Sequence, residues 1–131
     1  MIIGVGTDIC SVRRIEKAIE REEFVRRVYT IGEICYCKAR KKSGAASFAA
    51  RFAAKEAVLK AFGTGLRIGK MTDVEVIVDK LGAPHIQLHG EIMSFAEEKK
   101  VKEIHLSLSH EYDYATAFCV MEGYDENSFK G

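Results

Sequence analysis

The chain has 131 residues, of which 47% are hydrophobic and 30% charged, a size and composition that suit one folded domain and exclude wholesale disorder. Its formal net charge is +1 at pH 7, so no overall charge draws it to nucleic acid or to a membrane surface. No apolar run reaches the ~20 residues of a membrane span, and residues 1–4 lack the charged region of a signal peptide, so we expect a cytoplasmic protein.

The first segment predicts a strand followed by a helix. Residues 2–8 are rich in apolar and β-branched side chains and predict a buried strand that ends at Asp8. Residues 12–28 carry apolar side chains near helical spacing, and Ser11 just before them is a residue type that caps helices. A single helix over residues 12–28 is therefore expected.

Two more helices are expected before the middle of the chain. Thr30 and Glu33 match a capping box, which predicts a helix over residues 31–41. Residues 45–61 are rich in alanine, a strong helix former, and predict a long helix. The Gly-Thr-Gly sequence at residues 63–65 should end it.

The second half changes to the alternation that strands show. Residues 80–84 include the only proline and predict a hairpin turn. The expected elements are strands at 74–78, 85–89, 104–109 and 114–121 and a helix at 90–100. The pattern predicts the α+β class: a small, largely antiparallel sheet packed on a long helix, in one domain over residues 1–121 with a polar tail at 122–131.

One pair in the long helix suggests chemistry. Glu56 and Lys60 are four residues apart, so they share a helix face and, taken alone, indicate a surface ion pair. The strand-end carboxylate Asp8 and the glycine turn after the helix favour a phosphate site instead. Mg²⁺ needs only one or two carboxylates besides waters and phosphates. Asp8 and Glu56 are therefore candidate ligands, provided that the fold brings them together.

Two further groups each allow two interpretations. Ser107, Ser109 and His110 close a predicted strand and could donate hydrogen bonds to a phosphate or a ribose, or His110 could be an ordinary edge-strand histidine. Arg14 and Arg21 lie at helical spacing among interleaved glutamates. They indicate either a solvated helix face or a docking surface for an acidic protein.

Four sequence blocks, in this order, resemble the holo-acyl-carrier-protein synthase family, the small phosphopantetheinyl transferases. They are I-I-G-V-G-T-D-I at 2–9, R-F-A-A-K-E-A-V-L-K-A-F-G-T-G at 51–65, L-G-A-P-H-I at 81–86 and L-S-L-S-H-E at 106–111. The resemblance implies that family's fold and the magnesium-dependent transfer of the 4′-phosphopantetheine arm of coenzyme A to a serine of apo acyl carrier protein. Adenosine 3′,5′-bisphosphate would be released, and the reaction would support fatty acid biosynthesis.

The same resemblance implies residue roles. Asp8 and Glu56 would bind the metal, and Lys60 would face the pyrophosphate, which makes these three the expected catalytic residues. Arg14 and Arg21 would meet the acidic carrier protein, and the assembly would be a homotrimer with sites between subunits. The acceptor of the serine proton stays open between Asp8, Glu56 and a metal-bound water. The coenzyme A site would comprise Lys42, Arg51, Lys60, Gly63, Gly65, Ser109 and His110.

Two rival functions deserve comparison with the transferase. One is a non-catalytic module that binds a nucleotide or coenzyme A, and the other is a structural trimer whose helical face is only an interface. A pure binding module needs neither Asp8 and Glu56 nor Lys60, yet all three are present. The sequence therefore favours the enzyme.

Overall fold

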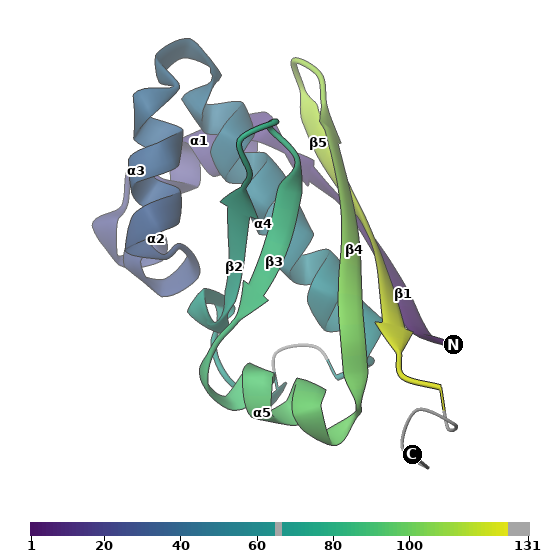
Figure 1. Cartoon of the computed structure of the whole chain (residues 1–131). Helices are drawn as coiled ribbons and strands as arrows, with labels where there is room; N and C mark the ends of the chain where they lie inside the picture. The colour runs from purple at the N-terminus through teal and green to yellow at the C-terminus, as the bar shows by residue number, and fades with distance from the viewer. Residues whose placement is uncertain (65–66, 126–131) are drawn as a thin grey trace.

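A long central helix, α4, organises the fold, with an antiparallel sheet on one side and shorter helices on the other (Figure 1). The computed structural model describes residues 1–64 and 67–125. Its helices are α1 (Val12–Ala18), α2 (Glu22–Val28), α3 (Ile31–Ala39), α4 (Gly44–Phe62) and α5 (Gly90–Glu98), with short 3₁₀ turns η1 (Lys41–Ser43) and η3 (Met71–Asp73). Its strands are β1 (Ile2–Ser11), β2 (Val74–Val78), β3 (Pro84–Leu88), β4 (Val101–His110) and β5 (Tyr114–Gly123).

The strands form two antiparallel sheets, in the orders β1-β5-β4 and β2-β3. This confirms the expected α+β class, with an antiparallel sheet packed on a long helix. The division into two sheets differs from the single sheet that the alternation predicted. Sequence alternation identifies strands but carries no information on which edges pair, and here α5 lies between β3 and β4 along the chain.

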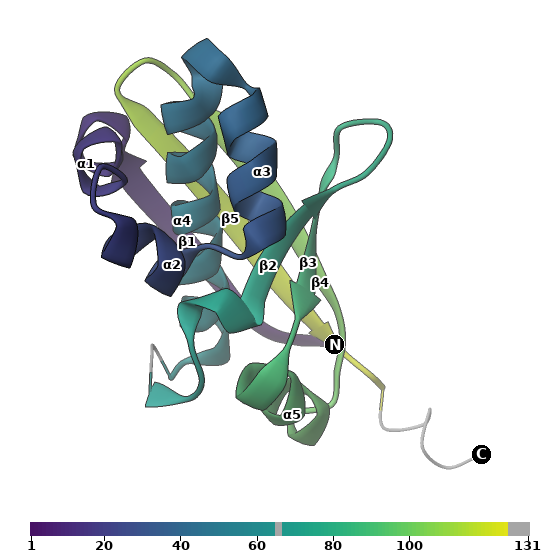
Figure 2. The ribbon, with the colours of Figure 1, turned by 90° about the vertical axis from the view of Figure 1, so that its left-hand side faces the viewer.

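β1 and α4 pack backbone against backbone. A Cβ atom at Gly6 would overlap the carbonyl oxygen of Ala57, and one at Gly4 would overlap that of Ala61. The alternating glycines of β1 therefore face the small residues of the helix, one turn apart. Figure 2, viewed from the helical side, shows α3 and α4 in front of β1 and β5.

The register places Asp8 on the face of the sheet that α4 covers. Asp8 is paired with Ala117 of β5, which is buried beneath the helix, whereas the neighbouring pair Thr7 and Phe118 lies on the opposite face. Because side chains alternate along a strand, Asp8 shares the face of Gly6. The strand thus delivers a carboxylate to the surface of α4.

The prediction of a single helix over residues 12–28 is wrong in one respect. The structure has two helices there, α1 and α2. Ser11 caps α1 as predicted, its Oγ accepting the Arg14 N–H at 3.2 Å. The chain then leaves the helix, and Arg21 has extended backbone before α2 begins. This break lets Phe24 pack on Phe52 of α4, with ring centroids 6.1 Å apart. Local periodicity cannot foresee a break that tertiary packing stabilises.

The remaining helix predictions agree closely with the structure. The capping box of α3 is confirmed: Thr30 Oγ1 accepts the Glu33 N–H at 3.2 Å, and Glu33 Oε1 accepts the Thr30 N–H at 2.9 Å. Gly63 ends α4 with a φ of 80°, a left-handed conformation that glycine adopts without strain. Gly65 lies outside the described residues.

A buried ion pair joins α3, α4 and β2, and sequence analysis did not anticipate it. Lys55 and Glu33 are both fully buried, with Nζ 2.8 Å from Glu33 Oε1. The ammonium also donates to the carbonyl oxygens of Met71 (3.1 Å) and Val74, and Glu33 Oε2 accepts the Val76 N–H at 2.8 Å. Burial lowers the pKa of Lys55, and Glu33 opposes that shift. These contacts fix α4 against its neighbours.

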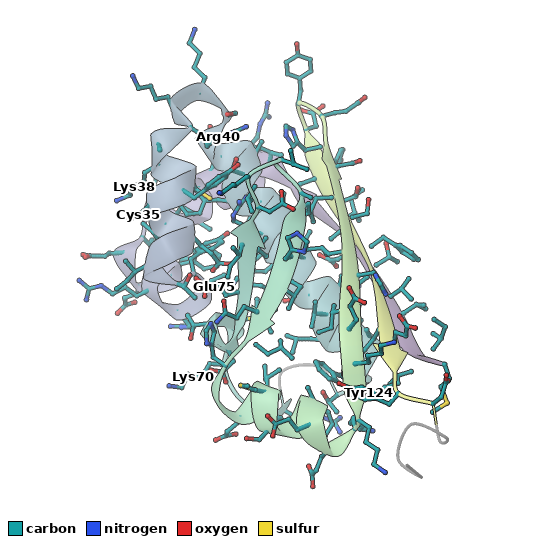
Figure 3. The ribbon with its side chains drawn as sticks, viewed as in Figure 1. Cys35, Lys38, Arg40, Lys70, Glu75 and Tyr124 are labelled. Carbon is teal, nitrogen blue, oxygen red and sulfur yellow. The ribbon has the colours of Figure 1, made fainter. Side chains whose placement is uncertain are left out.

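Surface features complete the description. Cys35, Lys38 and Arg40 lie on the exposed side of α3, while Glu75 on β2 accepts from Thr30 Oγ1 at 2.8 Å (Figure 3). β5 extends to Gly123, past the expected strand end at residue 121. Across residues 1–64 and 67–125, no helix combines the length and apolar character needed to cross a membrane.

Candidate functional site

The candidate site begins where β1 meets α4. Lys60 Nζ lies 3.0 Å from Asp8 Oδ1 and 3.0 Å from the carbonyl oxygen of Thr7. The Asp8 side chain is 17% exposed and that of Lys60 is 54% exposed. The prediction that the first strand ends at Asp8 is wrong, because pairing with β5 continues to Ser11 and Asp8 lies inside β1. Lys60 pairs with this carboxylate, so the predicted surface pair with Glu56 gives way to a contact between distant parts of the chain.

Glu56 shares a cavity with Asp8. Both carboxylates line a hollow of about 350 Å³ between β1, α1, α2 and α4. Partial burial and the neighbouring Asp8 raise the pKa of Glu56, and Lys60 opposes the shift. Asp8 disfavours the charged form of Glu56 more than Lys60 favours it, so a further cation beside the two carboxylates would be favourable.

These residues fit a magnesium ion. Mg²⁺ prefers oxygen ligands and keeps several waters, so two carboxylates beside an open cavity meet its needs. The repulsion that raises the pKa of Glu56 gives a physical reason for a cation to bind there. Asp8 and Glu56 would hold the ion, and Lys60, which is half-exposed beside Asp8, would face an anion brought to the same place.

The predicted docking residues line the same cavity. Arg14 and Arg21 line it together with the apolar side chains of Phe24 and Phe52. Both arginines are exposed, and they also line an adjoining hollow of about 540 Å³ with Lys17. The two carboxylates thus share a cavity whose rim carries two exposed arginines and whose wall includes two phenylalanine side chains.

Two other predicted residues meet at a different place. Lys42 of η1 and His110 at the end of β4 line a cavity of about 580 Å³. Ser109 pairs with Thr116 of β5, on the sheet face opposite Asp8. Within one chain, the residues expected to form the coenzyme A site are therefore divided among separate surfaces.

Arg51 is placed differently from the expectation of a ligand-lining residue. It is 4% exposed, with its guanidinium carbon 4.3 Å from the centroid of the Tyr36 ring. Its Nη1 donates to the Ser47 carbonyl oxygen at 3.2 Å, while Nε has no hydrogen-bond partner among the residues that the structure describes. In this conformation Arg51 stabilises the packing of α3 on α4, apart from the cavity of Asp8.

Sequence reasoning also missed lining residues of the site. Cys10, Phe24 and Phe52 border the carboxylates, and burial raises the pKa of the Cys10 thiol to about 11. Cys10 carried a usable signal, because it follows Asp8 by two positions in a strand and so shares its face. Phe24 and Phe52 carried none, since their meeting depends on the break between α1 and α2.

Comparison with known proteins identifies the family. Residues 4–119 match the model of the family described as the 4′-phosphopantetheinyl transferase superfamily. A curated holo-[acyl-carrier-protein] synthase from Clostridium tetani is 47% identical over 94% of this chain and 98% of its own length. The Neisseria meningitidis synthase structure has a TM-score of 0.84 at 35% identity, covering 93% of this chain and 99% of its own. A Bacillus anthracis synthase in complex with CoA (3′,5′-ADP) has a TM-score of 0.78 at 37% identity, covering 95% and 99%.

Proposed function

This chain belongs to the 4′-phosphopantetheinyl transferase superfamily, and we propose that it transfers the 4′-phosphopantetheine arm of coenzyme A to a serine of apo acyl carrier protein. The observation that supports the proposal is that Asp8 and Glu56 line one cavity while Lys60 pairs with Asp8. A module that only binds coenzyme A has no use for two repelling carboxylates beside a lysine.

The chemistry follows from this arrangement. The serine hydroxyl attacks the phosphorus that carries the pantetheine arm, the bond from that phosphorus to the bridging pyrophosphate oxygen breaks, and adenosine 3′,5′-bisphosphate leaves. Lys60, positioned by Asp8 and the Thr7 carbonyl oxygen, donates to the leaving oxygen or offsets its charge. The serine proton passes to Asp8, to Glu56 or to a water beside them. When bound, Mg²⁺ would neutralise charge on the pyrophosphate.

The proposed protein partner suits the rim of the cavity. A strongly acidic carrier protein would be attracted to Arg14 and Arg21, and the apolar wall formed by Phe24 and Phe52 would contact its uncharged side chains. Within the same proposal, the enzyme works in the cytoplasm and supplies holo carrier protein for fatty acid biosynthesis.

We further propose that the enzyme is a homotrimer. The sheet face opposite α4 exposes Val5 (57%), Ile9 (63%), Tyr114 (55%) and Phe118 (50%), an apolar surface of the kind that marks an interface. Ser109 lies on this same face, so contact with a second copy would bring it into the site. Sedimentation of a Phe118→Lys variant, which should dissociate into monomers, tests this part.

Intact-mass analysis tests the reaction itself. The chain is incubated with coenzyme A, Mg²⁺ and apo acyl carrier protein, and the carrier should gain the mass of phosphopantetheine. Glu56→Gln should abolish turnover at limiting Mg²⁺ without unfolding the protein, whereas Glu98→Gln, an exposed change on α5, should behave as the native chain. An unmodified carrier would refute the transferase, and near-normal turnover of Glu56→Gln would refute its ligand role.

A further inference from the structure

Lys55 is held by more parts of the fold than any other side chain of α4. Its ammonium lies 2.8 Å from Glu33 Oε1 of α3 and donates to the carbonyl oxygens of Met71 in η3 and Val74 at the start of β2. Among the residues that the structure describes, no other α4 side chain forms hydrogen bonds or ion pairs with more than one other element. Lys55 therefore fixes one point of the helix from three directions.

The Glu33 carboxylate is itself held on both oxygens. Its Oε1 accepts the Thr30 N–H at 2.9 Å, and its Oε2 accepts the Val76 N–H at 2.8 Å. Both donors are backbone groups, so the carboxylate cannot follow a displaced Lys55 unless α3 or β2 moves as well. The groups around the ammonium thus form a satisfied and rigid network.

The contact of α4 with β1 is different in kind. Gly4 and Gly6 lie against the backbone at Ala61 and Ala57, and none of these four residues has a side chain longer than a methyl group. Such a contact sets the distance between β1 and α4 but does not interlock against rotation of the helix about its axis. The ion pair of Lys60 on this side is half-exposed and weak. The aromatic contacts of α4 add apolar area, which is non-directional.

Glu56 follows Lys55 directly, so a rotation of α4 that released Lys55 would carry Glu56 with it. Successive residues lie about 100° apart around a helix, and Lys55 points to α3 and β2 while Glu56 lines the cavity of Asp8. A side-chain tip lies about 5–6 Å from the helix axis, so a rotation of about 15° would displace it by about 1.5 Å. Because Mg²⁺ demands near-ideal octahedral geometry with bonds of about 2.0–2.1 Å, that displacement would remove one ligand.

We propose that the buried pair of Lys55 and Glu33 positions the candidate site, by setting the rotation of α4 at which Glu56 lies beside Asp8. The inference rests on the proposed function, in which these two carboxylates hold the metal. Lys55 and Glu33 are positioning residues: they contact neither the substrates nor the metal and act only through Glu56.

Binding of Mn²⁺, followed by EPR, tests the proposal without relying on turnover. Mn²⁺ takes the same oxygen ligands as Mg²⁺, and the part of its binding that Glu56→Gln removes reports the candidate site. The double variant Lys55→Met/Glu33→Gln leaves no buried charge unpaired and should weaken that binding about tenfold, the lower end of what supporting contacts behind metal ligands contribute. Glu33→Gln alone, which keeps Lys55 bonded to its two carbonyl oxygens, should give a smaller loss and carries the test if the double variant does not fold.

A core variant elsewhere separates positioning from stability. Ile92→Ala truncates a residue of α5 that is 2% exposed, and it should destabilise the fold in urea without changing the Mn²⁺ affinity. Turnover of the two pair variants should fall at limiting Mg²⁺ while the KM for the carrier protein stays native, because Arg14 and Arg21 lie outside α4.

Two results would overturn the positioning role: native Mn²⁺ affinity in the folded pair variants, or an equal loss of affinity in Ile92→Ala. If the native chain itself shows no Mn²⁺ binding that depends on Glu56, the metal site of the proposed function fails instead. The two failures are therefore distinguishable.

Discussion

Replacing Lys55 with methionine should destabilise the fold far more than removing the exposed lysine of the site. The Lys55 side chain is fully buried, and its ammonium lies 2.8 Å from Glu33 Oε1 and 3.1 Å from the carbonyl oxygen of Met71. Methionine fills much of the same space but leaves the Glu33 carboxylate buried without its cation. Breaking a buried pair in this way costs about 3–5 kcal/mol.

Urea denaturation at a fixed protein concentration measures this loss. The matched control is Lys60→Met, whose ion pair with Asp8 is more exposed and should contribute only about 0–1 kcal/mol. Adding Glu33→Gln to Lys55→Met should recover part of the loss, because no buried charge is then unpaired. If Lys55→Met costs no more than Lys60→Met, the buried pair does not join α3, α4 and β2 as we infer.

Three further predictions concern the sheet, the docking face and a surface histidine. Gly6→Ala places a Cβ atom against a carbonyl oxygen of α4; we expect a loss of about 1–3 kcal/mol in urea denaturation, and reduced turnover as the carboxylates separate. Replacing Arg14 and Arg21 with glutamate should raise the KM for the carrier protein, most strongly at low salt, and leave the KM for coenzyme A unchanged. Glu122→Gln should lower the pKa of His105, because the hydrogen bond that the His105 ring donates to the Glu122 carboxylate raises it above the ordinary value of 6.5. That contact stabilises the fold below pH 6.5, and the stabilisation is lost as pH rises through the higher pKa of the folded state. Titration of the histidine ring by NMR measures this pKa.

Each of these has a contrary outcome. Native stability in Gly6→Ala would mean that β1 and α4 are not held at contact distance. An equal rise in both KM values after charge reversal at Arg14 and Arg21 would argue against a docking surface. A His105 pKa that does not respond to Glu122→Gln would mean that the 3.0 Å hydrogen bond between them is not formed in solution.

Local sequence determined most of the secondary structure. The alanine-rich segment predicted α4 because helix propensity accumulates over a long run, and Thr30 with Glu33 predicted the start of α3 because a capping box acts within one turn. The strands were recognisable from alternation, and Gly63 from its place after the last helical residue. Each of these signals depends on neighbours only a few residues apart, which a single sequence displays directly.

Tertiary structure decided which distant groups meet. The sequence offered Asp8, Glu56 and Lys60 as candidates, but only the register of β1 and its close packing on α4 through Gly6 place Asp8 beside the helix. The same packing changed the expected partner of Lys60 from Glu56 to Asp8.

The burial of Lys55 shows the same limit. In the sequence it precedes Glu56 in a helix of mixed character, and nothing nearby distinguishes a lysine destined for the core from one on the surface. Lys55 can be buried only because Glu33 and the carbonyl oxygens of η3 and β2 pair with its ammonium and offset the loss of hydration. Short-range patterns thus determined the helices and strands and identified the candidate reactive groups. Long-range packing determined the distances between those groups, because contacts between remote segments cannot be read from local residue spacing.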